Sequence, residues 1–206
     1  MRLAMRTVVL FVSLFTLTTA YAVPITIVSQ QDVWSYNQAT GLGSGLIGGG
    51  FATFTSGYTG TSTGNAAFGN SGLGGAPLYT TLWDANTALY LQKTVNLDGI
   101  ITGNATLNVA VDNGAAIFIN GTQVFNADAG GFTSIWEYTA SVSDSLFING
   151  LNTISVIAND YGGATYFDMQ LLANIEAATA NVPAPATFML MLSGTIALLS
   201  FRRQGS

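Results

Sequence analysis

The chain has 206 residues, and its composition excludes several kinds of chemistry at once. It contains no Cys and no His, so disulfides, thiolate or imidazole metal ligands, and Ser-His-Asp or Cys-His catalysis are all excluded. Charged residues make up only 7% of the chain and hydrophobic residues 49%, so the chain can bury a core. Four of the five basic residues lie at the chain ends, which leaves Lys93 against ten acids between them. Nucleic-acid binding is therefore excluded, and cations or neutral ligands such as sugars suit the chain better.

The first 22 residues have the three parts of a secretory signal peptide. Arg2 and Arg6 precede a short apolar run, and Ala20-Tyr21-Ala22 is a small-x-small cleavage site. We therefore expect residues 1–22 to be removed during export, which leaves Val23 as the new N-terminus.

Residues 40–80 are rich in Gly, Ser and Thr and show no sustained apolar period. The glycines do not have the spacing of a phosphate-binding loop, so nucleotide binding is excluded. We expect a long loop region here, with one short strand over residues 51–55.

From residue 80 onward, apolar and polar residues alternate. In the segment 88–97, for example, Leu89 and Leu91 fall on one face of an extended strand. The dipeptide Asn120-Gly121 between two such runs predicts a hairpin with a type I′ turn. Short strands with no convincing helix between them predict an all-β domain over residues 23–181, an antiparallel β-sandwich of the jelly-roll kind. The expected strands are 88–97, 105–111, 115–119, 122–125, 133–140, 152–158 and 165–175.

Three segments of this region resemble galactose-binding-like jelly rolls. They read YLQKTV at 90–95, DNGAAIFINGTQV at 112–124 and LNTISVIANDYGG at 151–163, and their order along the chain is also similar. The resemblance covers roughly residues 83–175 and implies a galactose-binding-like fold, in which Ca²⁺ is often held structurally. Gln92 stands where an Arg is common, so no basic ligand-facing residue is implied at that position.

Asp112 and Asn113 are the candidate metal ligands, because their side-chain oxygens suit Ca²⁺. Calcium takes six to eight oxygens, so Asp84, Asp160 or Asp168 would have to converge on the same place. The simpler interpretation, which we favour from the sequence, is that Asp112 and Asn113 bond the backbone of their own turn.

Tyr161 is the best candidate for a ligand contact, together with Asp160 and Asn159. A flat aromatic ring matches the apolar face of a pyranose, and the neighbouring polar side chains can bond hydroxyls. Tyr161 lies in a turn, where burial in the core is harder than on a strand. Four other aromatic residues are candidates for the same role, and the two tryptophans among them are expected to pack in the core. These are Trp83, Trp136, Tyr138 and Tyr166.

The last 25 residues have the parts of a membrane-associated sorting signal. Val182-Pro183-Ala184-Pro185 precedes an apolar run over 186–201, and Arg202-Arg203 follows it. This arrangement resembles the PEP-CTERM sorting tail, which implies processing by an exosortase after transient anchoring in the inner membrane by a C-terminal helix. Ala184 stands where that family has Glu.

The sequence thus predicts an exported, non-catalytic protein of the cell envelope, cell surface or extracellular matrix, associated with exopolysaccharide or biofilm and binding a glycan. One alternative is a structural or adhesive surface protein without a small ligand. A less favoured alternative is a weak glycan hydrolase, since Glu137, on an expected strand, and Glu176 are the only glutamates and form no recognisable pair with an Asp.

Overall fold

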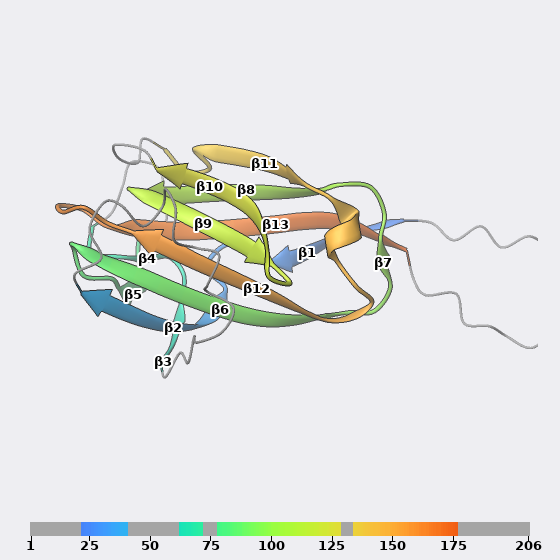
Figure 1. The fold of residues 1–206 in the computed structure, drawn as a ribbon, viewed down its shortest axis with the longest axis horizontal. Coiled ribbons are helices and arrows are strands. Elements are labelled where there is room, and N and C mark those ends of the chain that lie inside the picture. Colours follow the sequence, from blue (N-terminus) through green and yellow to red (C-terminus); the bar gives the residue numbers. More distant parts are fainter. Residues whose placement is uncertain (1–21, 41–61, 72–77, 129–133, 177–206) are drawn as a thin grey trace, which may run out of the picture.

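Two β-sheets packed face to face make up the described part of the chain (Figure 1). The computed structural model describes residues 22–40, 62–71, 78–128 and 134–176. The signal peptide up to residue 21, the expected strand 51–55 and the sorting tail lie outside these residues. Within them, no helix is long and apolar enough to cross a membrane.

The first sheet has seven strands, and β13 is its central member. Its strands pair antiparallel, except that β4 and β5 run parallel. The order is β11 (Tyr138–Val142), β8 (Ala105–Asp112), β13 (Tyr166–Glu176), β4 (Phe68–Gly69) and β5 (Thr81–Leu82), and β1 (Val23–Val28) and β7 (Ile100–Ile101) also pair with β13.

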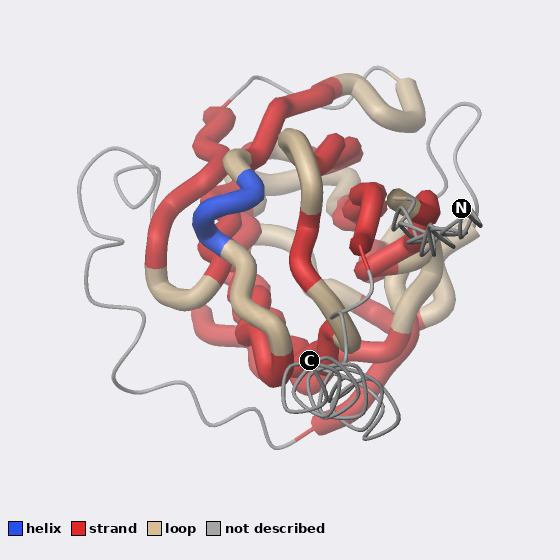
Figure 2. The backbone as a smooth tube through the Cα atoms, turned by 90° about the vertical axis from the view of Figure 1, so that its right-hand side faces the viewer, coloured by secondary structure: helices blue, strands red, loops and turns tan. Residues whose placement is uncertain are grey.

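The second sheet has six strands, all paired antiparallel. Its order is β10 (Thr122–Asp128), β9 (Gly114–Ile119), β12 (Gly150–Asn159), β6 (Thr87–Leu97), β2 (Val33–Thr40) and β3 (Ser62–Asn65). One short 3-10 helix, η2 (Asp144–Leu146), joins the sheets at one end of the sandwich and is the blue segment in Figure 2. The predicted all-β antiparallel sandwich is therefore confirmed.

Alternate residues of each strand fill the space between the sheets. On β6, Leu89 and Leu91 are fully buried, as the alternation predicted. Lys93 follows on the same face of β6, but its side chain is only partly buried, and its Nζ lies 2.9 Å from a carboxylate oxygen of Asp32. The largest buried side chains of the main core are Trp34, Phe68, Trp83, Leu89, Leu91, Leu107, Ile117, Ile119, Ile154, Phe167 and Met169.

The predicted hairpin at Asn120-Gly121 is confirmed. It joins β9 to β10, and both residues have positive φ, 49° at Asn120 and 83° at Gly121. Two consecutive left-handed residues are what a type I′ turn requires, and Asn and Gly tolerate them best.

The region 40–80 is not a continuous loop, because the structure places β3 and β4 within it. Gly64 of β3 lies so close to Tyr36 and Thr81 that a Cβ atom would be 2.6 Å from the Thr81 hydroxyl oxygen. Phe68 of β4 is fully buried, with its ring centroid 5.2 Å from that of Tyr36. The strands were missed because glycine, used here for close packing, is also the usual sign of a loop.

The strand expected over 133–140 begins later than predicted. β11 starts at Tyr138, so Glu137 precedes the strand instead of lying within it. Trp136 has a φ of 55°, which is incompatible with an extended strand. The alternation of bulky residues therefore indicated a strand where the chain turns.

The two ends of β13 mark the two ends of the sandwich. Val23, the residue after the predicted signal-peptide cleavage site, pairs with Ile175 at the C-terminal end of β13. Tyr166, at the other end, pairs with Asp112. Since β13 has 11 residues, these two ends are roughly 35 Å apart.

Candidate ligand site at one end of the sandwich

The predicted metal ligands and the predicted ligand contacts come together in space. The backbone N–H of Asn113 donates to the carbonyl oxygen of Asn159 at 3.1 Å. The backbone N–H of Tyr161 donates to the side-chain oxygen of Asn113 at 2.8 Å. We call this cluster the end site and define it as Asp112, Asn113, Asn159, Asp160 and Tyr161. The expectation that Asn113 only bonds its own turn is corrected, because its partner is 48 residues away.

Asp160 is 1% exposed, and only one of its carboxylate oxygens is bonded within the described chain. Oδ2 accepts the backbone N–H groups of Asn86, at 2.6 Å, and Gly162, at 2.8 Å. Oδ1 is buried and has no hydrogen-bond partner among the described residues. The two backbone donors fix the carboxylate through one oxygen and leave the other without a partner in the described chain.

Asn159 is fully buried, and neither its amide oxygen nor its amide nitrogen has a partner of ordinary hydrogen-bond geometry in the part of the chain described. The amide is nevertheless near enough to Tyr161 to oppose the rise of the phenol's pKa. Buried polar atoms without partners are rare in folded proteins, because each one forfeits its bonds to water. The amide of Asn159 is thus placed to bond a ligand atom.

Negative charge is concentrated at the end site. Burial, followed by the nearby carboxylates of Asp160 and Glu137, raises the pKa of Asp112 from 3.8 to about 6. Lys93 is the one basic residue among the described residues, and it pairs with Asp32. A bound cation would offset this repulsion directly.

Tyr161 is bonded to Asp128, a residue that was not predicted from the sequence to be part of a site. Its phenol hydroxyl donates a hydrogen bond to the carboxylate of Asp128, the last residue of β10. Burial and this bond raise the pKa of Tyr161 to about 12. Asp128 pairs with Gly114, next to Asn113, only because a β-bulge between Gln123 and Phe125 shifts the hairpin register by one residue. Extending the register from the turn would have placed Ala127 there, so no direct signal in the sequence pointed to Asp128.

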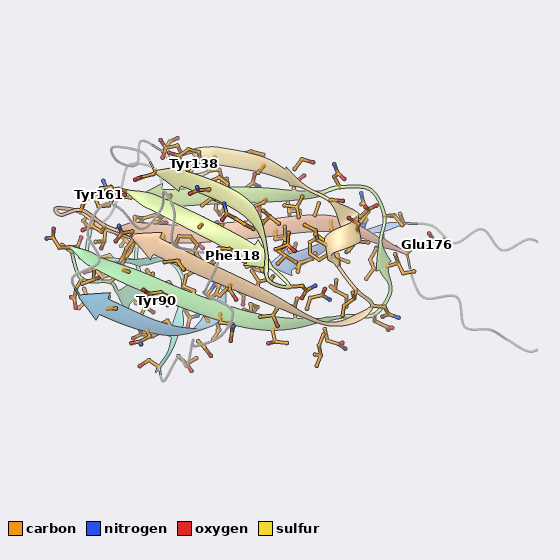
Figure 3. All side chains as sticks on the ribbon, in the orientation of Figure 1. Tyr90, Phe118, Tyr138, Tyr161 and Glu176 are labelled. Carbon is orange, nitrogen blue, oxygen red and sulfur yellow. The ribbon has the colours of Figure 1, made fainter. Side chains whose placement is uncertain are left out.

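The remaining sequence candidates lie elsewhere or in the core. Asp168 accepts backbone N–H groups of Gln31 and Met169, and Asp84 is exposed. Of the three additional ligands proposed from the sequence, Asp160 is the one near enough to Asp112 to act on its pKa. Trp83 is fully buried in the core, as predicted. Figure 3 shows Tyr161 and Glu176 at opposite ends of the sandwich.

The residue types at the end site fit a hard cation such as Ca²⁺. Carboxylate and amide oxygens of Asp112, Asn159 and Asp160 are the ligand types that this ion prefers. No group of three or more Asp, Glu, His or Cys residues that could hold a metal ion is found among the described residues. The site would therefore supply part of a calcium shell, and water or ligand hydroxyl groups would supply the rest.

Comparison with known proteins gives structural similarity only. No family model and no curated protein sequence matches the chain. A Streptomyces avermitilis α-L-rhamnosidase is 21% identical over 47% of this chain and 11% of its own, with a TM-score of 0.34. A Ruminococcus gnavus β-glucuronidase is 10% identical over 78% of this chain and 31% of its own, with a TM-score of 0.45. The PA14 domain of the antifreeze protein MpAFP is 21% identical over 52% of this chain and 60% of its own, with a TM-score of 0.32. The chain spans less than a third of the length of either enzyme.

Proposed function

We propose that the chain is an exported, non-catalytic surface protein that binds a glycan at the end site with the help of Ca²⁺. One observation carries the proposal: beside the carboxylate of Asp112, Oδ1 of Asp160 is buried without a partner among the described residues, and the buried amide of Asn159 has no bond of ordinary geometry among them. A sugar hydroxyl both donates and accepts hydrogen bonds. It can therefore satisfy an amide oxygen, an amide N–H and a carboxylate oxygen in one small space.

Bound Ca²⁺ would supply positive charge and open coordination positions for a pair of ligand hydroxyls. Asp112 and Asp160 would hold the ion with their carboxylates, and Asn159 with its amide oxygen. Asn113 would be a positioning residue and not a ligand, because its side-chain oxygen accepts the backbone N–H of Tyr161 and so holds that turn in place. The raised pKa of Asp112 is the expected cost of burying this carboxyl, and of gathering other acids near it, before a cation binds.

Display of the end site away from the membrane is consistent with this function. β1 begins, and β13 ends, at the end of the sandwich opposite Asp112, so a signal peptide over 1–22 and a tail over 182–206 would both attach there. We propose that an exosortase processes the tail at Val182-Pro183-Ala184-Pro185 and releases the domain to the surface. Mass spectrometry of the mature surface protein tests this step, and a protein that still carries residues 186–201 would contradict it.

The binding proposal is tested with the full chain, purified in detergent. Calorimetry should detect Ca²⁺ binding, and a glycan array should give signals that EDTA abolishes. Asp112→Asn should weaken Ca²⁺ binding at least tenfold, whereas Asp98→Asn, the same change at an exposed position on the opposite end, should not. Ca²⁺ binding without any glycan signal, including the exopolysaccharide of the source, would favour the structural or adhesive alternative.

One observation favours the hydrolase alternative enough to be tested. Asp112, with a pKa near 6 and Glu137 close by, has the property of a general acid. Release of reducing sugar from a bound glycan, lost in both Asp112→Asn and Glu137→Gln, would establish hydrolysis. Binding without release would support the non-catalytic proposal.

A further inference from the structure

Trp136 differs from the other two tryptophans in its surroundings. Trp34 and Trp83 are 1% and 0% exposed and belong to the core between the sheets. Trp136 is only partly buried and packs outside that core, against a small cluster on the outer face of the first sheet. That cluster consists of Ala67, Ala110 and Tyr166.

This position is beside the end site. Tyr166, against which the indole packs, is the direct cross-strand partner of Asp112. Facing side chains of such a pair have Cβ atoms about 5 Å apart. The next residue along the chain, Glu137, is near enough to Asp112 for its carboxylate to act on that group. The indole therefore packs on the cross-strand neighbour of Asp112, one of the acids that would hold Ca²⁺.

The backbone at Trp136 is held in an unfavourable conformation. Its φ of 55° falls in the left-handed region, where a side chain with a Cβ atom crowds its own backbone. β11 begins two residues later and does not require this turn. Such outliers persist where the surrounding structure holds them, often at binding sites. Here the result is to lay a large aromatic ring on Tyr166.

We propose that Trp136 is the stacking platform that determines ligand class, and that the end site takes a neutral hexopyranose in preference to an anionic sugar. This inference rests on the proposed glycan-binding function. The indole offers a flat apolar surface to the C–H face of the ring, while the end site engages hydroxyl groups. Bound Ca²⁺ would offset the charges of Asp112 and Asp160, which leaves the carboxylate of Glu137, next to Trp136 in the chain, to repel uronate and sulfate groups. The described residues offer no basic side chain here to oppose that repulsion.

The test uses the full chain with Ca²⁺, and methyl glycosides of neutral hexoses and of uronic acids as probes. Trp136→Ala should weaken binding of the neutral glycoside at least tenfold and leave Ca²⁺ affinity in sugar-free buffer within twofold. Trp136→Phe, which keeps a smaller ring, should lose less. Tyr90→Leu, an aromatic replacement on the outer face of the other sheet, serves as the matched control and should bind as the original chain does.

A purely structural role for Trp136 would be recognised by two readouts. Asn tolerates a left-handed backbone, so Trp136→Asn keeps the turn without the ring and should remain folded while losing sugar affinity. The neutral sugar should also change the tryptophan fluorescence of the original chain and not that of Trp136→Phe. Undiminished sugar binding in folded Trp136→Asn, or preference for the uronic acid, would overturn the inference while leaving the proposed function intact. Absence of binding by the original chain would overturn both.

Discussion

The side-chain oxygen of Asn113 accepts the backbone N–H of Tyr161 at 2.8 Å, and so joins two turns that are 48 residues apart in the chain. A second bond runs in the other direction, from the N–H of Asn113 to the carbonyl oxygen of Asn159. The pair of bonds fixes the turn after β12 against the turn between β8 and β9. Asn113 therefore holds together the two turns that carry the oxygens of the end site.

Asn113→Ala should destabilise the domain and weaken the end site together. It leaves a partly buried N–H of Tyr161 without its acceptor, which costs about 1–3 kcal/mol. Thermal unfolding followed by circular dichroism should show the loss, and calorimetry should show weaker Ca²⁺ binding. Asn104→Ala is the control, because its amide bonds Ser141 at an exposed position, and it should cost less than about 0.5 kcal/mol. Equal effects of the two changes would contradict the positioning role.

Asp112→Asn should have opposite effects with and without Ca²⁺. Burial and the acids nearby raise the pKa of Asp112, so the neutral amide should stabilise the cation-free fold at pH 7.5. The same change removes a proposed ligand, so the rise in melting temperature that Ca²⁺ gives the original chain should disappear. Melting curves in EDTA and in millimolar Ca²⁺ measure both effects. A variant that melts lower in EDTA and still responds to Ca²⁺ would contradict the proposal on both counts.

The side chain of Asn120 should stabilise the fold beyond its role in the hairpin turn. Its side chain donates to the carbonyl of Leu146 at 2.8 Å and to Asn152 at 2.9 Å, and accepts the N–H of Thr153 at 2.9 Å. Asn120→Gly keeps a residue that favours positive φ but loses all three bonds, so it should still cost about 2 kcal/mol or more. Urea denaturation measures this cost. A loss of only a few tenths of a kcal/mol would mean that backbone conformation alone explains Asn120.

The strands and the turn that could be predicted are those whose sequence carries a recognisable local pattern. β6 and β8 have clear alternation, and β9 and β10 flank the Asn120-Gly121 turn, which has a distinctive sequence. β4 and β5 have two residues each and carry no period that could be recognised. β2 does alternate, with Trp34 and Tyr36 facing inward. It could therefore have been predicted as a strand from its sequence.

The candidate site was predicted in two separate pieces, because its assembly depends on strand register. Asp112-Asn113 and Asn159-Asp160-Tyr161 were each found from turn residues, but only the pairing of β9 with β12 brings them together. Trp136 was assigned to packing because aromatic residues near strands usually pack. Its positive φ is a property of the folded backbone, and a Trp gives no sign of it in the sequence.

The stability of the fold should fall as the pH rises from 4 to 8, chiefly because of Asp168. Burial raises the pKa of this carboxyl from 3.8 to about 7, and the backbone N–H bonds from Gln31 and Met169 only partly oppose the rise. Between these two values the folded state keeps a proton that the unfolded chain has lost. The stabilisation is therefore complete below pH 3.8 and is lost as the pH passes 7, by about 4 kcal/mol at most.

Asp168→Asn separates this effect from the rest of the chain. Oδ1 of Asp168 accepts the Met169 N–H at 2.9 Å, and the Gln31 N–H is shared between Oδ1, at 3.2 Å, and Oδ2, at 3.3 Å. An Asn with its oxygen in the Oδ1 place keeps the Met169 bond and the Oδ1 part of the Gln31 bond. The variant should match the original chain below pH 3.8 and exceed it in stability at pH 8, because the buried negative charge is gone. Urea denaturation across this range in EDTA measures the difference, with Asp98→Asn as the exposed control. A variant less stable than the original chain at pH 8 would show that Asp168 is ionised and stabilising there, opposite to what its burial implies.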